Sequence, residues 1–229
     1  MDKLNASIFQ YHGETYELEF ENILNGITTC YHMMVSDEVA VPNNNEEEIR
    51  DILYNGYLKN NTVRNSIGLN YNIVCEPAEY VDGKLSGYVD ILIFSRNSLT
   101  DTTAYFIIEC KRLDNKYVKG ISGLNAKYIG NGIIRFVDGQ YPSNKGLNGM
   151  IGFVVEPMDI AGNILHINDL LAQNFRDART EVFLTNTTFI RNFDYQYYSI
   201  HKDLNSKKIK LYHLMFDFSG NLDSKRANP

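Results

Sequence analysis

The sequence has no tryptophan, only three cysteines, and no uninterrupted apolar run near the ~18 residues that a membrane span needs. Cys30, Cys75 and Cys110 are odd in number and widely spaced, without a zinc-knuckle pattern, so we expect reduced thiols in a cytoplasmic protein. Residues 1–7 lack a basic region followed by an apolar stretch, so no secretory signal is expected. These absences disfavour a disulfide scaffold and association with a membrane.

Positive charge is also in short supply, because 22 Lys and Arg stand against 28 Asp and Glu, which gives a net charge of −6. A protein that coats DNA without specificity is usually basic, so that class is disfavoured. The charge does not exclude an enzyme acting on nucleic acid, since metal-binding acids and a local basic strip can coexist with an acidic remainder. The 44% hydrophobic and 22% charged residues are typical of a globular protein, here one large domain rather than two small ones.

Two strongly apolar runs carry the most informative residues. The run 87–94 contains Asp90, and the run 105–111 contains Glu109 and ends with Lys111. An apolar strand has little reason to hold such groups unless they meet a cation or each other, because unpaired buried charge costs several kcal/mol or more.

The alternation of side chains along a strand predicts how these groups are arranged. Glu109 and Lys111 share one face, while the Cys110 side chain points to the other. If the two runs pair, Asp90 converges on the same face. The carboxylates and the backbone carbonyl of Cys110 then offer the oxygen ligands that Mg²⁺ prefers, with Lys111 placed to orient or deprotonate a water or to offset charge.

The alternative without catalysis is a structural ion pair at a strand end, formed by Lys111 with Glu109 or Asp90. A lone Glu-x-Lys is weak evidence, whereas the complete set of two apolar strands with Asp, Glu and Lys is far more specific. No nucleophile elbow, phosphate-binding loop or dinucleotide fingerprint is visible. His201 and His213 have no metal-ligand spacing, so we expect hydrogen-bonded structural histidines.

The paired segments resemble the motif of the PD-(D/E)XK nuclease superfamily, which has the restriction endonuclease-like fold. The resemblance implies that Asp90 and Glu109 bind Mg²⁺, for which Mn²⁺ may substitute, and that Lys111 is catalytic. Val89 stands where the family has its proline, a commonly tolerated substitution. The implied fold is α/β, with a central mixed β-sheet flanked by helices, and the match covers roughly residues 45–156.

The order of the expected elements agrees with one mixed-sheet α/β domain over 45–229, preceded by an N-terminal extension, 1–44, that packs on the core. From apolar periodicity and turn residues we expect helices over 21–34, 46–58, 125–138 and 164–178, and strands over 16–20, 71–80, 87–94, 105–111, 149–156, 195–201 and 209–218.

An acid-led helix precedes the two strands, with Asn45 as its expected N-cap. In the superfamily this helix often places a Glu at the metal site. Glu46 is the first choice, because its spacing from Ile49 and Leu53 lets it share their inward stripe, and Glu48 is the second. It is equally open that these acids only favour the positive end of the helix dipole.

A later helix, 125–138, carries a polar stripe of Lys127, Asn131 and Arg135 that could contact nucleic-acid phosphates. A solvated helix face is the alternative. Lys145 lies in a Gly-bounded loop and is a further candidate for contact with nucleic acid, although a surface lysine explains it as well.

The resemblance is less complete beyond this helix. Some members of the superfamily carry a Gln and a Tyr within it, whereas Gln140 and Tyr141 are expected in the loop that follows, so that role is not carried over. The stretches 135–141 and 212–218 look similar to uncharacterised bacterial restriction-endonuclease-like proteins.

The resemblance therefore implies a Mg²⁺-dependent nuclease that hydrolyses phosphodiester bonds, of DNA in preference to RNA, leaving a 5′-phosphate and a 3′-hydroxyl. It also suggests a role in restriction or phage defence, and a homodimer or a partner subunit. The alternative is a binding or assembly subunit that keeps the nuclease fold without catalysis, which the acidic charge favours and the intact Asp, Glu and Lys set opposes.

Overall fold

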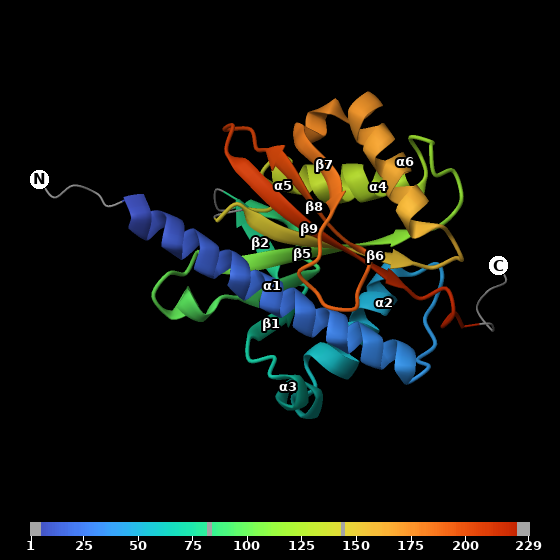
Figure 1. Ribbon diagram of the computed structural model, residues 1–229, viewed down its shortest axis with the longest axis horizontal. Coiled ribbons are helices and arrows are strands. Elements are labelled where there is room, and N and C mark those ends of the chain that lie inside the picture. Colours follow the sequence, from blue (N-terminus) through green and yellow to red (C-terminus); the bar gives the residue numbers. More distant parts are fainter. Residues whose placement is uncertain (1–5, 82–83, 143–144, 224–229) are drawn as a thin grey trace, which may run out of the picture.

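The computed structural model describes residues 6–81, 84–142 and 145–223, and it is an α/β fold whose seven-stranded mixed sheet is flanked by helices (Figure 1). The strand order is β1-β4-β5-β6-β9-β8-β7, with β2 and β3 forming a separate hairpin. The strands are β1 (Asn72–Cys75), β2 (Ala78–Val81), β3 (Lys84–Tyr88), β4 (Ile91–Phe94), β5 (Tyr105–Leu113), β6 (Leu147–Val154), β7 (Thr180–Asn186), β8 (Gln196–Lys202) and β9 (Lys208–Asp217).

The helical segments include regular α-helices and short 3₁₀ or π segments. They are α1 (Ala6–Ser36), α2 (Glu46–Leu53), the π-turn η1 (Tyr54–Leu58), α3 (Asn61–Ile67), the 3₁₀-turn η2 (Arg96–Leu99), α4 (Leu124–Tyr128), the π-turn η3 (Ile129–Ile133), α5 (Ile134–Val137), α6 (Ile160–Gln173) and the 3₁₀-turn η4 (Arg176–Ala178). Among the described residues, no helix is both long and apolar enough to cross a membrane.

The sheet combines both pairing directions, as expected. Strands β1, β4 and β5 are antiparallel, β5, β6 and β9 are parallel, and β9, β8 and β7 are antiparallel again. The predicted neighbours β4 and β5 are therefore paired, and so is the predicted closing pair β8 and β9. The parallel centre requires a crossover from β5 to β6, and the helical segments α4 to α5 supply it.

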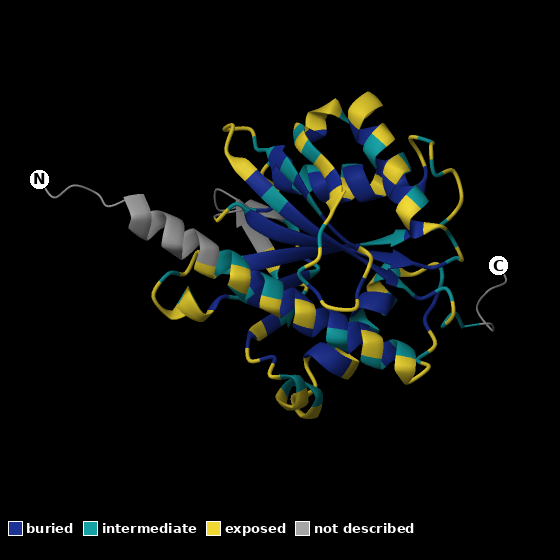
Figure 2. Cartoon of the chain, viewed as in Figure 1, coloured by how far each residue is buried: buried dark blue, intermediate teal, exposed yellow. Residues whose placement is uncertain are grey.

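The two faces of the sheet bury separate apolar clusters. Helices α1 and α2 cover one face, and α4, α5 and α6 cover the other (Figure 1). Strand β5 shows the alternation directly, because Phe106, Ile108 and Cys110 belong to the first cluster while Ile107 belongs to the second. The central strands are correspondingly buried on both faces (Figure 2).

The N-terminal segment corrects one prediction. The strand expected over 16–20 does not exist, because these residues lie inside α1, which also contains the expected helix 21–34. A helical stripe decides the structure: the buried residues Phe20, Ile23, Leu24, Ile27, Cys30, Tyr31 and Met34 recur every three or four positions. Gly26 lies inside this helix, and its missing side chain leaves room for Leu69.

The other helices differ from expectation mainly at their ends. The helix expected over 46–58 is α2 followed by η1, and the one expected over 125–138 contains η3 at its centre. The helix expected over 164–178 begins earlier, at Ile160, where the Asp159 side chain accepts from Gly162 N. Strand β7, the β2–β3 hairpin and helix α3 were not predicted.

Candidate active site

Asp90 lies between β3 and β4, at the point where the β2–β3 hairpin separates from the main sheet, and not inside a strand. The strands expected over 71–80 and 87–94 are each interrupted, so that β1 and β4 pair in the main sheet while β2 and β3 pair as a separate hairpin. The interruptions face each other at Glu76 and Asp90, where Glu76 N donates to the Asp90 carbonyl at 3.2 Å. Glu76 adopts φ 52°, which is uncommon for a residue other than glycine.

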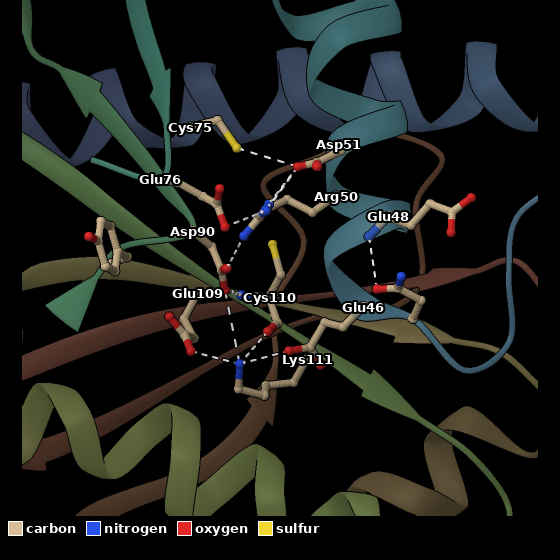
Figure 3. A network of polar contacts seen from close by, with 12 residues as sticks. Glu46, Glu48, Arg50, Asp51, Cys75, Glu76, Asp90, Glu109, Cys110 and Lys111 are labelled. Carbon is tan, nitrogen blue, oxygen red and sulfur yellow. Dashed lines mark hydrogen bonds and ion pairs between the residues drawn. The ribbon is translucent and has the colours of Figure 1, made fainter. Parts of the chain in front are cut away.

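Strand β5 supplies the other acid and the lysine, on the predicted face. The Lys111 ammonium lies 2.7 Å from Glu109 Oε1 and donates to the Cys110 carbonyl, also at 2.7 Å (Figure 3). Glu109 is only 1% exposed. The Cys110 side chain belongs to the apolar cluster on the opposite face, and burial raises the pKa of its thiol well above the usual range. Cys110 can therefore offer its carbonyl oxygen but not a thiolate.

Helix α2 brings Glu46 to the same point. Glu46 Oε1 accepts from Lys111 Nζ at 3.0 Å, and Oε2 accepts from Arg112 N at 2.6 Å. Asn45 caps the helix through a 3.2 Å hydrogen bond to Glu48 N, and the Glu48 carboxylate points away from Lys111 (Figure 3). Of the two acids considered in this helix, the structure thus brings Glu46 to the site and leaves Glu48 outside.

One cation already faces every predicted metal ligand. The Lys111 ammonium contacts Glu109, Cys110 O and Glu46, and it lies 4.0 Å from Asp90 Oδ2. Within the described ranges, no three His, Cys, Asp or Glu side chains are already assembled as a metal-ligand set. The donors nevertheless fit Mg²⁺, since they are the carboxylate and carbonyl oxygens that this ion prefers, and they surround a positive charge.

The buried acid and lysine perturb each other. Burial raises the pKa of Glu109 to about 7, and the negative charge of Asp90 adds to the increase. Burial alone would lower the pKa of Lys111, but the three surrounding carboxylates hold it above its ordinary value. The ammonium therefore keeps its proton at neutral pH in this arrangement.

Two further residues that the sequence did not assign complete the cluster. Arg50, from α2, donates to Asp90 Oδ1 at 2.7 Å. On the other side, the Tyr141 hydroxyl lies 2.7 Å from Glu109 Oε2 and accepts from Arg135 at 2.6 Å. Tyr141 lies after the helix, as expected, yet its side chain still reaches the site. The superfamily's Gln and Tyr pair was the only signal that pointed toward it.

The polar stripe after the strands borders the same site. A groove of about 490 Å³ lies beside the cluster, and its lining includes Glu46, Lys111, Lys127, Asn131 and Arg135. Lys127 and Asn131 are exposed. Arg135 is not a free phosphate ligand, because its guanidinium also contacts Glu109 Oε1 at 3.1 Å.

Lys145 lies elsewhere. Its ammonium pairs with Asp101 at 2.6 Å, and it borders a different cavity together with Tyr16 and Lys210. We therefore interpret Lys145 as a surface lysine, because it is paired with Asp101 and lies away from the candidate site.

The two histidines of the closing strands form a buried hydrogen-bonded chain, as expected. His201 Nδ1 lies 2.8 Å from the Ala178 carbonyl, Ser199 Oγ lies 2.7 Å from both His201 Nε2 and His213 Nε2, and His213 Nδ1 lies 2.8 Å from the Tyr128 hydroxyl. Burial lowers the pKa of both imidazoles, and a carbonyl can only accept, so His201 Nδ1 donates. With neutral rings, His201 Nε2 then accepts from Ser199 Oγ, Ser199 Oγ accepts from His213 Nε2, and His213 Nδ1 accepts from the Tyr128 hydroxyl. Both rings are neutral in this arrangement, and every nitrogen has a partner.

Comparison with known proteins adds no assignment. No family model matches the chain, and neither the curated proteins nor the solved structures contain a significant match. The chemistry of the cluster and its groove is therefore the basis on which function is inferred.

Proposed function

We propose that this protein is a Mg²⁺-dependent nuclease with a restriction endonuclease-like core, which hydrolyses phosphodiester bonds of DNA in preference to RNA. One observation carries the proposal. The carboxylates of Asp90, Glu109 and Glu46 and the carbonyl of Cys110 all face one shared cation, the Lys111 ammonium, beside a groove lined by Lys127 and other polar residues. A role in restriction or phage defence is part of the proposal.

The ligands of the ion would be Asp90, Glu109, Glu46 and the Cys110 carbonyl, with Mn²⁺ as a substitute. When bound, the ion would polarise the scissile phosphate and lower the pKa of a water. Glu109 is oriented for this role by Tyr141, whose hydroxyl contacts the oxygen that Lys111 leaves free. Glu46 is oriented by the backbone N–H of Arg112.

Without an ion, Lys111 is a fixed positive charge among the proposed ligands. Its carboxylate neighbours raise its pKa, so it retains its proton at neutral pH in the arrangement described above. A retained ammonium can orient a water and offset the negative charge that develops on a phosphate oxygen. Of the three roles that the sequence allowed for Lys111, these two require the ammonium, whereas deprotonation of a water requires the neutral amine.

The groove would hold the nucleic-acid strand on either side of the cleaved bond. Lys127 and Asn131 project from α4 and η3, one helical turn apart, and both are exposed. Their ammonium and amide groups suit phosphate oxygens, which position a strand without reading its sequence. Arg135 contributes charge to the same wall while it holds Glu109.

The test is cleavage of plasmid DNA, single-stranded DNA and RNA by purified protein with Mg²⁺. We expect wild type to cleave DNA, chelation to abolish cleavage, and Asp90→Ala and Lys111→Ala to lower the rate by about 100-fold or more. Lys145→Ala is the matched control, since this lysine lies in another cavity and should leave the rate unchanged. Equal cleavage by wild type and both site variants would exclude the catalytic assignment.

A second candidate is a binding or assembly subunit with the same fold and no catalysis. The observation that favours it is the closed network: Asp90 Oδ1 is bonded to Arg50, Asp90 Oδ2 to Cys110 N, and both Glu109 oxygens to neighbouring side chains. Calorimetric titration with Mg²⁺ discriminates, because a purely structural network binds no ion and the Asp90→Ala variant would then give the same trace as wild type.

A further inference from the structure

Asp90 is held between two cations on opposite sides. Its Oδ2 faces the Lys111 ammonium and accepts from Cys110 N at 2.7 Å, while its Oδ1 accepts from Arg50 at 2.7 Å (Figure 3). Both oxygens are therefore fixed, and only Oδ2 faces the cluster that contains Glu109. Nothing in the proposed hydrolysis uses Arg50, although its side chain is buried directly behind the first metal ligand.

Arg50 is 2% exposed and is surrounded by acids. Besides Asp90, its guanidinium contacts Asp51 Oδ1 at 2.9 and 3.1 Å and Glu76 Oε1 at 2.9 Å. Three carboxylates thus converge on one buried positive charge. An isolated buried guanidinium would be very costly, so the acids and Arg50 are required together.

Two cations neutralise Asp90 from different sides, and each has further acids around it. Here the positions on the two sides of Asp90 belong to different cations: Lys111 with its acids on one side, and Arg50 with Asp51 and Glu76 on the other.

We propose that Arg50 takes the place of a divalent counter-ion behind Asp90, holding Asp90 so that one oxygen faces the cluster and the site binds one ion per chain. The inference rests on the proposed function, because it concerns the same site. Arg50 is a positioning residue here: it touches Asp90 and not the substrate. Its planar guanidinium can contact three carboxylates at fixed angles and cannot lose its charge.

The consequence for Arg50 variants is specific. Replacing the guanidinium by a neutral side chain leaves Asp90, Asp51 and Glu76 without their shared counter-cation. These carboxylates are not a metal-ligand set while the guanidinium separates them, but their oxygens are the type that a divalent ion prefers, and such an ion can replace the lost charge. Removal of Arg50 should therefore create a second site, whereas a residue with only a packing role would leave the number of bound ions unchanged.

The experiment counts Mn²⁺ ions per chain by electron paramagnetic resonance, with thermal unfolding to confirm that each variant is folded. We expect one ion for wild type, two for Arg50→Gln, and one for Arg50→Lys, which keeps the charge. Arg50→Met, which is also neutral, is the second variant in case Arg50→Gln does not fold. Arg96→Gln is the control, because this exposed arginine lies against Tyr71 and should leave the count at one.

The outcomes separate this inference from the proposed function. Two ions in wild type, or one ion in a folded neutral variant, overturns the role of Arg50 and leaves the nuclease proposal standing. No ion in wild type contradicts the metal site itself, and both proposals then fail together.

Discussion

The Glu109 carboxylate and the Tyr141 hydroxyl lie 2.7 Å apart, although the two residues are 32 positions apart and come from different elements. Glu109 belongs to β5, and Tyr141 to the loop after α5. Arg135 joins them by contacting both. The acid proposed as a metal ligand is thus held on one oxygen by Lys111 and on the other by a tyrosine.

Tyr141→Phe should weaken this support. Loss of the hydroxyl leaves Glu109 Oε2 without its partner, which should cost about 1–3 kcal/mol of stability. Supporting groups around metal ligands typically change activity by about 10–100-fold, so we expect a loss of that size in Mg²⁺-dependent cleavage. Urea unfolding and a plasmid cleavage assay measure the two effects. Tyr117→Phe is the control, since Tyr117 is 80% exposed; equal losses in both variants would contradict the prediction.

Lys127→Ala should weaken binding to nucleic acid. The lost charge removes one phosphate contact, so the slope of log affinity against log salt should fall by about one. Fluorescence anisotropy with a labelled duplex at several salt concentrations, without divalent ions, separates binding from cleavage. Lys119→Ala is the matched control, because Lys119 borders a different cavity. An unchanged slope for Lys127→Ala would remove this lysine from the interface.

His201 should make the fold acid-sensitive. Burial lowers the pKa of His201 to about 4, from an ordinary value of about 6.5. The unfolded chain therefore binds more protons between these values, and stability is lost as the pH falls from about 6.5 toward 4, by up to about 3 kcal/mol from this residue. Denaturant unfolding of wild type and His201→Gln at pH 7 and pH 5 measures it. The same loss in both proteins would show that His201 does not contribute.

Asn168 should protect the edge of the sheet. Strand β7 is an outer strand, and the Asn168 side chain from α6 bonds both Leu184 N, at 2.9 Å, and Leu184 O, at 3.0 Å. An edge strand with free backbone groups invites pairing with another chain. Asn168→Ala should increase self-association, detected by light scattering over a range of concentrations. Gln173→Ala, on the exposed side of the same helix, should remain like wild type; equal association would contradict the role of Asn168.

Local sequence was sufficient to predict the arrangement of β5. Alternation along one strand placed Glu109 and Lys111 on one face, and the apolar runs predicted that β4 and β5 pair. The same rule failed for residues 16–20, where a window of five residues alternates by chance. Leu18 should then have been buried with Phe20, but it is 58% exposed because α1 continues through it.

The rest of the site depends on contacts between residues distant in sequence. Arg50 meets Asp90 across 40 positions, and nothing in the acid-led helix indicates that this one arginine points inward. At Glu76 the only local signal was Pro77, which interrupts a strand; φ 52° is uncommon for glutamate, and no glycine marks the turn. Only the folded chain brings these groups around Asp90.

The hairpin β2–β3 leaves the main sheet at the residue that bears the proposed metal ligand. Glu76 and Asp90 are joined there through their backbones, and the carboxylates of both are bonded to Arg50. Asp90 and Glu76 are therefore tied twice, once through their backbones and once through Arg50, so the position of the proposed metal ligand depends on the point where β2 and β3 leave the sheet.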